Sequence, residues 1–442
     1  MNENRLHMYP DLQSKSASLY KLACEVMPGG NTRNTMFTSP YPIYSARGAG
    51  SRIYDVDGVE RIDFLNNYSS LIHGHAHPEI VKAARDQLEI GTCYAFPTEF
   101  EIKLAQLLCN RIPSAEHIRF TNSGTEAVMM ALKAARAFTS RPKIAKFEGG
   151  FHGAYDLAEV SVYSNPGNWG ETVPSNIPGS AGTPKSILDE AVILPFNDVS
   201  TARSILLSQA KEIAAIMIDP MPAYVAMIPA NQEYLTMLRQ VADEFGIVLI
   251  SDEVVVFRLG YNGAQGVFNF QADLTLLGKI IGGGFPVGAI CGRADIMSVF
   301  DPTKGMARVP HGGTFNANPM AMSAGLTTME LMTPSAYEQI NKMGDYCRHE
   351  LNSLFKRHNL SAQITGLGSL LRIHLHSNPI LNYRTSYISP SLLSKFHQLY
   401  RNALNNGIVI GPAGLAVMST AMTSADADKF IEVIYNSVKE IK

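Results

Sequence analysis

Short apolar runs alternate with longer stretches of helical pattern through the middle of the chain. The apolar runs have the length of buried strands, and the stretches between them are rich in Ala, Met and Leu. The predicted strands are His117–Thr121, Ile144–Phe147, Ala214–Asp219, Ile247–Ser251, Leu274–Leu277 and Val287–Cys291. The predicted helices among them are Gly124–Ser140 and Glu233–Phe245. This alternation is typical of an α/β protein, in which helices cover both faces of a largely parallel sheet.

The pattern changes after Thr333. A helix over about 335–358, the strand Leu370–Leu375 and the helix Ser391–Asn406 predict a smaller α+β domain. We therefore predict three parts: an N-terminal segment that packs with the small domain (1–60), a large domain (61–332) and the small domain itself (333–442). Within the large domain, Asn165–Lys185 is rich in Gly, Pro, Ser and Asn. It predicts a long surface loop, either an active-site cover or a variable insertion.

The composition excludes several classes of protein. The chain has 442 residues, a net charge of −2 and 46% hydrophobic residues, as in an ordinary globular protein. Its basic residues are dispersed, which argues against a nucleic-acid groove or an anionic membrane surface. No apolar run approaches the ~18–20 residues that span a bilayer, and the N-terminus lacks the apolar core of a signal peptide. The five cysteines include no Cys-x-x-Cys pair, so we expect no disulfide framework, no zinc site and a cytoplasmic location.

Lys279 is the most informative single residue. It follows the strand Leu274–Leu277 and Gly278, and a cluster of glycines comes after it. An amine at the end of a buried strand is desolvated, which lowers its pKa and makes it nucleophilic. Such a lysine is suited to a Schiff base with an aldehyde cofactor, and pyridoxal phosphate (PLP) is the leading candidate. Most lysines in strand-to-loop turns are surface residues, so the position alone leaves a structural role open.

Asp252 is the first candidate partner of Lys279. It follows the buried run Ile247–Ser251, and a buried carboxylate needs a partner. In a PLP enzyme that partner is the protonated pyridine nitrogen, which keeps the ring electron-poor. The alternative is a carboxylate that caps a turn after the strand.

A second candidate is the polar turn Ser123-Gly124-Thr125, which lies between a predicted strand and a predicted helix. Backbone N–H groups at a helix N-terminus form an anion site, and small residues let a phosphate approach closely. The same pattern, with Glu126, is also a capping box that needs no ligand. The two interpretations are compatible.

Three other motifs are weaker. Phe151 is flanked by glycines after a strand, where it could stack on a flat ring or belong to the core, and His152 beside it is more often structural. The segment His311–Asn318 offers small polar residues that could add donors to a phosphate. The run from His73 to His77 has no nearby set of carboxylates or cysteines, so we predict no metal there.

These motifs occur in an order and spacing that resembles the class III aminotransferases of PLP fold type I over nearly the whole chain. Within that family the chain looks most similar to the branch that holds glutamate-1-semialdehyde aminomutase and the β-amino-acid aminotransferases. The motifs that carry the resemblance are Met27–Arg33, Phe120–Ala127, Gly149–Gly153, Asp252–Val254, Gly278–Gly284 and Gly313–Asn316. The resemblance implies a large domain with a mostly parallel, seven-stranded type of sheet between helices, plus a smaller α+β domain.

The resemblance also implies a role for each cofactor residue. Lys279 would form the Schiff base, and Asp252 would pair with the pyridine nitrogen. The phosphate would be held by Ser123, Gly124 and Thr125.

The remaining implied roles concern the ring, the partner subunit and the substrate. Phe151 would stack on one face of the PLP ring, and Val254 would pack on the other. Thr314 would reach the phosphate of the neighbouring subunit, which implies a homodimer. Arg33 matches the family arginine that binds a substrate carboxylate, a task that suits a bidentate guanidinium.

Three segments depart from the family pattern. Val256 stands where a threonine near the ring is usual, and Asp219 replaces the glutamate of the usual Glu-Pro pair. Near the C-terminus, Gly411–Leu415 has neither the arginine expected at about Ala413 in the β-amino-acid enzymes nor the Ser-Gln-Phe-Glu-like segment of the semialdehyde aminomutase. This segment predicts against authentic heme-pathway aminomutase activity and leaves open whether 2-oxoglutarate is an acceptor.

Taken together, the motifs predict a PLP-dependent aminotransferase with a ping-pong mechanism. It would move an amino group from a carboxylate-bearing amine, a β-amino acid or an unusual α-amino acid, to a keto acid, with Lys279 shuttling the proton. The same first steps can end in an aminomutase or in a racemase or epimerase. A catalytically silent PLP-fold module is a further alternative, but such a protein would be expected to lose Lys279 or Asp252.

Overall fold

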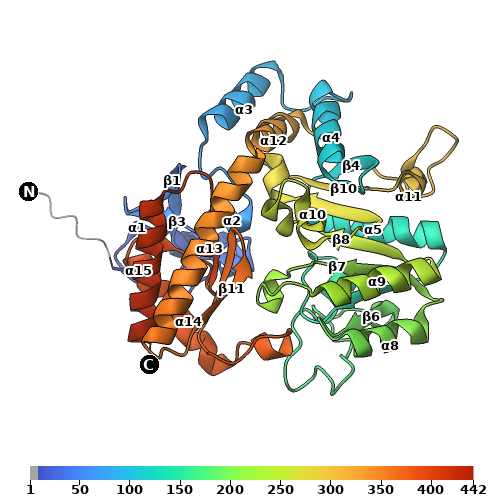
Figure 1. Cartoon of the computed structure of the whole chain (residues 1–442). Coiled ribbons are helices and arrows are strands. Elements are labelled where there is room, and N and C mark those ends of the chain that lie inside the picture. Colours follow the sequence, from blue (N-terminus) through green and yellow to red (C-terminus); the bar gives the residue numbers. More distant parts are fainter. Residues whose placement is uncertain (1–7, 442) are drawn as a thin grey trace, which may run out of the picture. The chain divides into compact units, whose positions relative to one another are not determined.

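The computed structural model describes residues 8–441, which form two compact units (Figure 1). The first unit consists of the chain up to His77, Lys342–Ser377 and the chain from Ile388 onward. The second unit consists of Pro78–Asn341 and Asn378–Tyr387. The predicted domain boundaries, after residues 60 and 332, differ from these limits. The two units are defined by compactness alone, so the predicted domains stay a prediction.

A seven-stranded sheet forms the centre of the second unit. Its strands, in spatial order, are β4 (His117–Thr121), β10 (Gly288–Gly292), β9 (Leu274–Gly278), β8 (Val248–Asp252), β7 (Ile213–Ile218), β5 (Lys143–Phe147) and β6 (Ala191–Leu194). Only β10 runs antiparallel to its neighbours, β4 and β9. The predicted α/β class with a largely parallel sheet is therefore confirmed. The edge strand β6 was not predicted.

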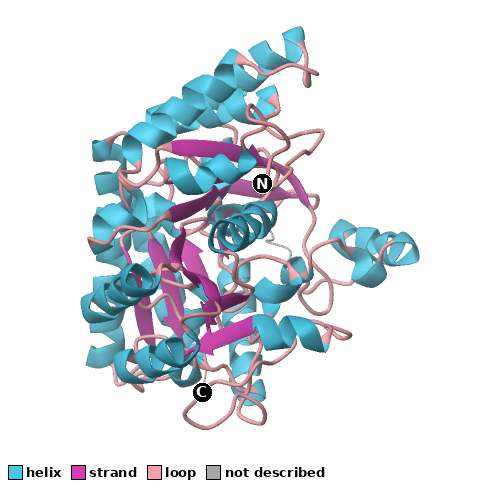
Figure 2. Ribbon diagram, turned by 90° about the vertical axis from the view of Figure 1, so that its right-hand side faces the viewer, coloured by secondary structure: helices cyan, strands magenta, loops and turns pink. Residues whose placement is uncertain are grey.

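Helices bury both faces of this sheet. Alternate residues of β7 point to opposite faces: Ala215 and Met217 join the core cluster that contains helix α5, whereas Ile216 and Ile218 join the cluster with α8 and α9. Figure 2 shows the strands, in magenta, between layers of cyan helices. Because both faces are covered, the strands are almost continuously apolar, and six of the seven were predicted from such runs.

The helices of the second unit surround this core. They are α3 (Pro78–Ile90), α4 (Glu99–Arg111), α5 (Gly124–Thr139), α6 (Asp156–Glu159), α7 (Lys185–Glu190), α8 (Val199–Gln209), α9 (Gln232–Phe245), α10 (Gly263–Phe268), α11 (Ala294–Met297) and α12 (Pro319–Leu331). The limits of α5 and α9 agree with the predicted helices to within one residue. Among residues 8–441, no helix combines the length and apolar character needed to cross a bilayer.

The first unit joins the two ends of the chain through a small sheet. Its strands are β1 (Ser45–Ala49), β2 (Arg52–Asp55), β3 (Glu60–Asp63) and β13 (Ile408–Val409), and a second sheet contains β11 (Gln363–Leu367), β12 (Leu370–His374) and β14 (Leu415–Val417). Its helices are α1 (Lys15–Val26), α2 (Asn66–Ser69), α14 (Pro390–Asn405) and α15 (Ser424–Glu440), and α13 (Pro334–Arg357) contains the limit between the units. Because β13 pairs in parallel with β3, the N-terminal residues share a unit with the C-terminal ones.

Residues 378–387 form a strap that belongs to the second unit although the first unit flanks it in sequence. Arg384 of the strap pairs with the buried Glu148, with Nε 2.8 Å from Oε2, and its Nη2 donates to the carbonyl of Trp169 at 2.7 Å. Tyr383 packs on Gly149, where any Cβ would lie 2.0 Å from the ring. The strap thereby fixes the segment after β5 and the predicted long loop.

Lys146 is a charged type of residue that lies in the core, where it is only 1% exposed. It lies in β5, and its Nζ donates to the carbonyl of Val160 at 2.6 Å. Burial lowers the pKa of Lys146 from its ordinary value of 10.5 to about 7, because charging an amine away from water is costly.

This shift predicts a pH-dependent stability. Between pH 7 and 10.5 the unfolded chain keeps the proton of Lys146 and the folded chain does not, so unfolding takes up a proton and stability rises with pH. We expect the free energy of unfolding of the wild type, relative to Lys146→Met, to rise by about 1.4 kcal/mol per pH unit in this window. Urea titrations at pH 7, 8 and 9 measure it. The exposed Lys211→Met is the control, and a difference that stays constant with pH would contradict the prediction.

Candidate active site

The predicted cofactor residues of the second unit follow strands that end at one edge of the sheet. Gly288, at the start of β10, pairs with both Thr121 of β4 and Gly278 of β9. The ends of these strands are therefore level, and Asp252 ends the neighbouring strand β8. Ligands of α/β proteins bind at this carboxyl edge.

Lys279 begins a single 3₁₀ turn, Lys279–Gly282, immediately after β9. Its backbone has a φ of +49°, a left-handed conformation that is strained for a residue with a side chain and is often found at functional sites. Burial lowers the pKa of Lys279 below that of an ordinary lysine, and the nearby charges of Asp252 and Asp219 oppose this shift. The result is an amine that loses its proton more readily than an exposed lysine.

Asp252 is buried and forms a short contact with His152. The residues Asp252 and His152 are 5% and 2% exposed, and His152 Nδ1 lies 2.6 Å from Asp252 Oδ2. The other carboxylate oxygen accepts from the backbone N–H of Val254 at 3.1 Å. The sequence favours a structural role for His152, since nothing in the spacing links positions 100 residues apart. The structure makes it the direct neighbour of the predicted cofactor carboxylate.

Asp219 adds a second buried carboxyl to this region. Burial raises the pKa of Asp219 well above the usual range, and the charge of Asp252 raises it further. Val256, at the position where the family threonine is usual, is fully buried in the core. In the sequence, Asp219 and Val256 stand out only as departures from the family pattern.

The residues predicted to bind a phosphate, Ser123, Gly124 and Thr125, lie at the N-terminus of α5, and we call them the predicted phosphate turn. Ser123 caps the helix by accepting from the N–H of Glu126 at 3.2 Å, and Glu126 Oε2 accepts from the N–H of Asn122 at 3.0 Å. Thr125 Oγ1 accepts from the N–H of Ala154 at 3.2 Å. The helix is therefore well capped, while its first N–H groups still lack acceptors within the helix.

Close backbone contacts keep this end of α5 near the sheet. A Cβ on Gly288 would lie 2.1 Å from the carbonyl oxygen of Ser123, so only glycine fits there. Val254 lies between Gly124 and Gly278, whose Cβ positions would be 3.2 and 3.3 Å from its methyl carbons. Val254 therefore lies beside both the phosphate turn and the residue that precedes Lys279.

Phe151 and Thr314 both lie at the surface of the second unit. Phe151 is 40% exposed, and its ring stacks on Tyr224 with centroids 5.1 Å apart. Thr314 lies in an exposed turn. This turn is connected to the phosphate turn because Asn316 Oδ1 accepts from Asn122 Nδ2 at 2.7 Å.

Arg33 belongs to the first unit. Its Nη1 donates to Asn67 Oδ1 at 3.0 Å, and its guanidinium lies 6.0 Å from the ring centroid of Tyr68. The histidine run is in the same unit. His75 Nε2 lies 2.8 Å from Asp63 Oδ2, and His73 Nδ1 lies 2.8 Å from Thr420 Oγ1. Within residues 8–441 there is no group of three or more His, Cys, Asp or Glu side chains placed to hold a metal ion.

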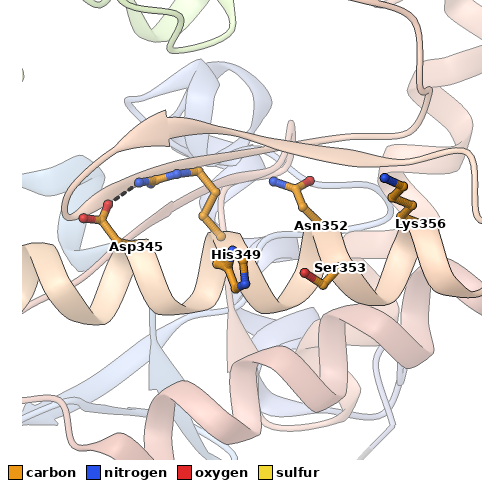
Figure 3. Close-up of a pocket in the computed structure, with 6 residues that line it drawn as sticks. Asp345, His349, Asn352, Ser353 and Lys356 are labelled. Atoms are coloured by element: carbon orange, nitrogen blue, oxygen red, sulfur yellow. Dashed lines mark hydrogen bonds and ion pairs between the residues drawn. The ribbon is translucent and has the colours of Figure 1, made fainter.

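An open hollow lies along α13 of the first unit (Figure 3). Asp345 and Arg348 pair at its end, and the remaining lining residues are His349, Asn352, Ser353 and Lys356. None of these residues belongs to the predicted site.

The donor set at the sheet edge fits PLP. It offers an amine of lowered pKa, a buried carboxylate backed by His152, and a helix N-terminus for a phosphate. An exposed aromatic ring, Phe151, is available to pack against a flat heterocycle.

Comparison with known proteins agrees with this assessment. The family described as aminotransferase class-III matches residues 36–439. An omega-transaminase from Sphaerobacter thermophilus is 47% identical, with 98% of this chain and 99% of that chain covered and a TM-score of 0.95. A beta-phenylalanine aminotransferase from Variovorax paradoxus is 35% identical, with 95% and 93% covered and a TM-score of 0.86.

Curated relatives are named aminomutases rather than transaminases. The glutamate-1-semialdehyde 2,1-aminomutase of Thermodesulfovibrio yellowstonii is 38% identical over 435 residues, 97% of this chain and 99% of that protein. The family uses PLP, and a solved transaminase relative contains it. The family match spans most of the chain and the relatives match almost end to end; the chain belongs to the class III aminotransferases, PLP-dependent enzymes of fold type I.

Proposed function

We propose that this enzyme is a transaminase that moves an amino group from a carboxylate-bearing amine to a keto acid by a ping-pong mechanism. The observation that carries the proposal is the placement of Lys279 and the His152–Asp252 pair at the ends of adjacent strands. Bound PLP would supply an electron sink for the carbanion that forms when the substrate loses a proton. The remaining steps depend on the chain's own side chains.

Lys279 would act as general base and then as general acid. Its lowered pKa favours a neutral amine, which would accept the proton from the substrate carbon and, as an acid, would then donate it. Asp252 would hold a proton on the pyridine nitrogen, and the contact with His152 fixes the direction in which its carboxylate points.

The other predicted roles complete this proposal. Ser123, Gly124 and Thr125 would bind the phosphate at the start of α5. Phe151 and Val254 would pack on opposite faces of the ring, and Thr314, in its exposed turn, would reach the phosphate of a partner subunit in a homodimer. The five cysteines are all free, in keeping with a reducing compartment such as the cytoplasm.

The proposed donor is a β-amino acid or an unusual α-amino acid. Arg33 would bind its carboxylate through two parallel hydrogen bonds. The beta-phenylalanine aminotransferase from Variovorax paradoxus supports a β-amino acid as one member of this class.

The second candidate is an aminomutase that returns the nitrogen to an adjacent carbon. The names of the curated relatives favour it, more directly than they favour transamination. Against the specific heme-pathway reaction stands the segment Gly411–Leu415, which lacks the Ser-Gln-Phe-Glu-like sequence. A racemase or epimerase would use the same side chains.

We expect Lys279→Ala to abolish covalent attachment of the cofactor, since it removes the buried amine of lowered pKa that follows β9. Wild-type enzyme incubated with PLP should absorb near ~420 nm, and borohydride reduction followed by peptide mass spectrometry should find the cofactor on Lys279. Lys304→Ala, in an exposed turn, is the matched control and should behave like the wild type. A colourless wild type, or attachment that survives in Lys279→Ala, would show the assignment to be wrong.

We expect a nitrogen-15-labelled amino donor to yield a free keto product and a labelled amino acceptor in equal amounts, because the two half-reactions share one amino group. Mass spectrometry of both products, with Lys279→Ala as the inactive control, makes the measurement. If the label stays in one rearranged product, the enzyme is an aminomutase. If it stays in the inverted donor, the enzyme is a racemase.

A further inference from the structure

Three aromatic rings of the second unit form one continuous exposed surface. Phe151 stacks on Tyr224 with centroids 5.1 Å apart and planes 21° apart, and Tyr163 meets Tyr224 edge-on at 6.3 Å. The rings are 40%, 39% and 53% exposed for Phe151, Tyr224 and Tyr163. We call this surface the aromatic stripe. It begins at the residue proposed to stack on the cofactor ring.

The stripe is held in place by buried structure on both sides. Tyr224 lies in the 3₁₀ turn Ala223–Val225, between the buried Met221 and Val225. Beside Tyr163, the carbonyl of Ser164 accepts from Tyr383 of the strap at 2.6 Å. An aromatic surface that is fixed before binding loses little entropy when a ligand covers it.

The charge near the stripe restricts what it can bind. Burial raises the pKa of Tyr163 to about 12, with further contributions from Tyr224 and from the negative charge of Glu159. An anionic group placed at the far end of the stripe would be repelled by that carboxylate. A flat, uncharged group would instead gain stacking and apolar burial.

We propose that the aromatic stripe binds an aryl substituent of the amino donor and that Tyr224 is the main residue that selects it. The inference rests on the proposed transaminase function and narrows its substrate class. Donors with an uncharged aromatic ring are preferred over donors with a short aliphatic chain or a second carboxylate. Phe151 contributes at the cofactor end and Tyr163 at the outer end.

Tyr224→Ala and Tyr224→Phe test this proposal in the full-length, PLP-loaded enzyme. The quantity compared is the ratio of kcat/KM for β-phenylalanine to that for 3-aminobutanoate. We expect this ratio to fall about tenfold in Tyr224→Ala, since one ring contact and its apolar area are lost. Tyr224→Phe keeps the ring, so its ratio should equal that of the wild type. Tyr261→Ala removes an equally exposed tyrosine, at 38%, outside the stripe and should not alter it.

A binding measurement without turnover separates the stripe from the chemistry. Ligand-observed NMR gives the dissociation constants of 3-phenylpropanoate and butanoate, which lack the amine. Tyr224→Ala should weaken binding of the aryl acid about tenfold relative to butanoate. If both acids and both donors change by the same factor, or neither changes, the stripe does not select the substrate. If the wild type attaches no PLP or transfers nitrogen from no donor, the proposed function itself fails instead.

Discussion

The pairing of Gly288 with two strands at once is the constraint on which the site depends. One residue of β10 lies opposite Thr121 on one side and Gly278 on the other, so the turns that follow β4 and β9 must leave the sheet at the same height. A side chain at position 288 would collide with the backbone of the phosphate turn. The relative positions of the predicted phosphate turn and Lys279 are thus set by the backbone pairing of the sheet.

Burial then gives these positions their chemistry. A carboxylate and an amine removed from water are costly unless charges compensate, and here Asp252, Asp219 and Lys279 influence one another across adjacent strand ends. Burial and the charge of Asp252 both favour the neutral form of Asp219, whereas the charge of Lys279 opposes this shift. The left-handed backbone at Lys279 is a local strain that the surrounding sheet is able to hold.

The sequence was sufficient for the parts whose signal is local. Buried strands are continuous apolar runs, so β4 was predicted with its observed limits, and Lys279 and Asp252 were proposed as site residues because each follows such a run. The sequence could not reveal elements that form only by pairing with residues far away in the chain. The two-residue strand β13 has no periodicity of its own and exists only because β3 is beside it.

The neighbours of the candidate site residues could not be predicted for the same reason. His152 and Asp252 come from different strand ends, and only the order of the strands brings them together. Tyr224 lies in a short turn with no motif, although its ring contacts Phe151, which the sequence did single out. The roles of Arg33 and Thr314 depend on groups outside their own unit or chain, and these roles stay predictions.

The strap has a consequence for how this protein can be divided. A contiguous fragment from Pro78 to Asn341 would contain every predicted cofactor residue of one subunit, yet it would lack Arg384 and Tyr383. Glu148 would then lose the cation that pairs with it, and Gly149 would lose its contact with the ring of Tyr383. The second unit is therefore not encoded as one continuous segment, because the residues that complete it, Asn378–Tyr387, follow a stretch of the first unit.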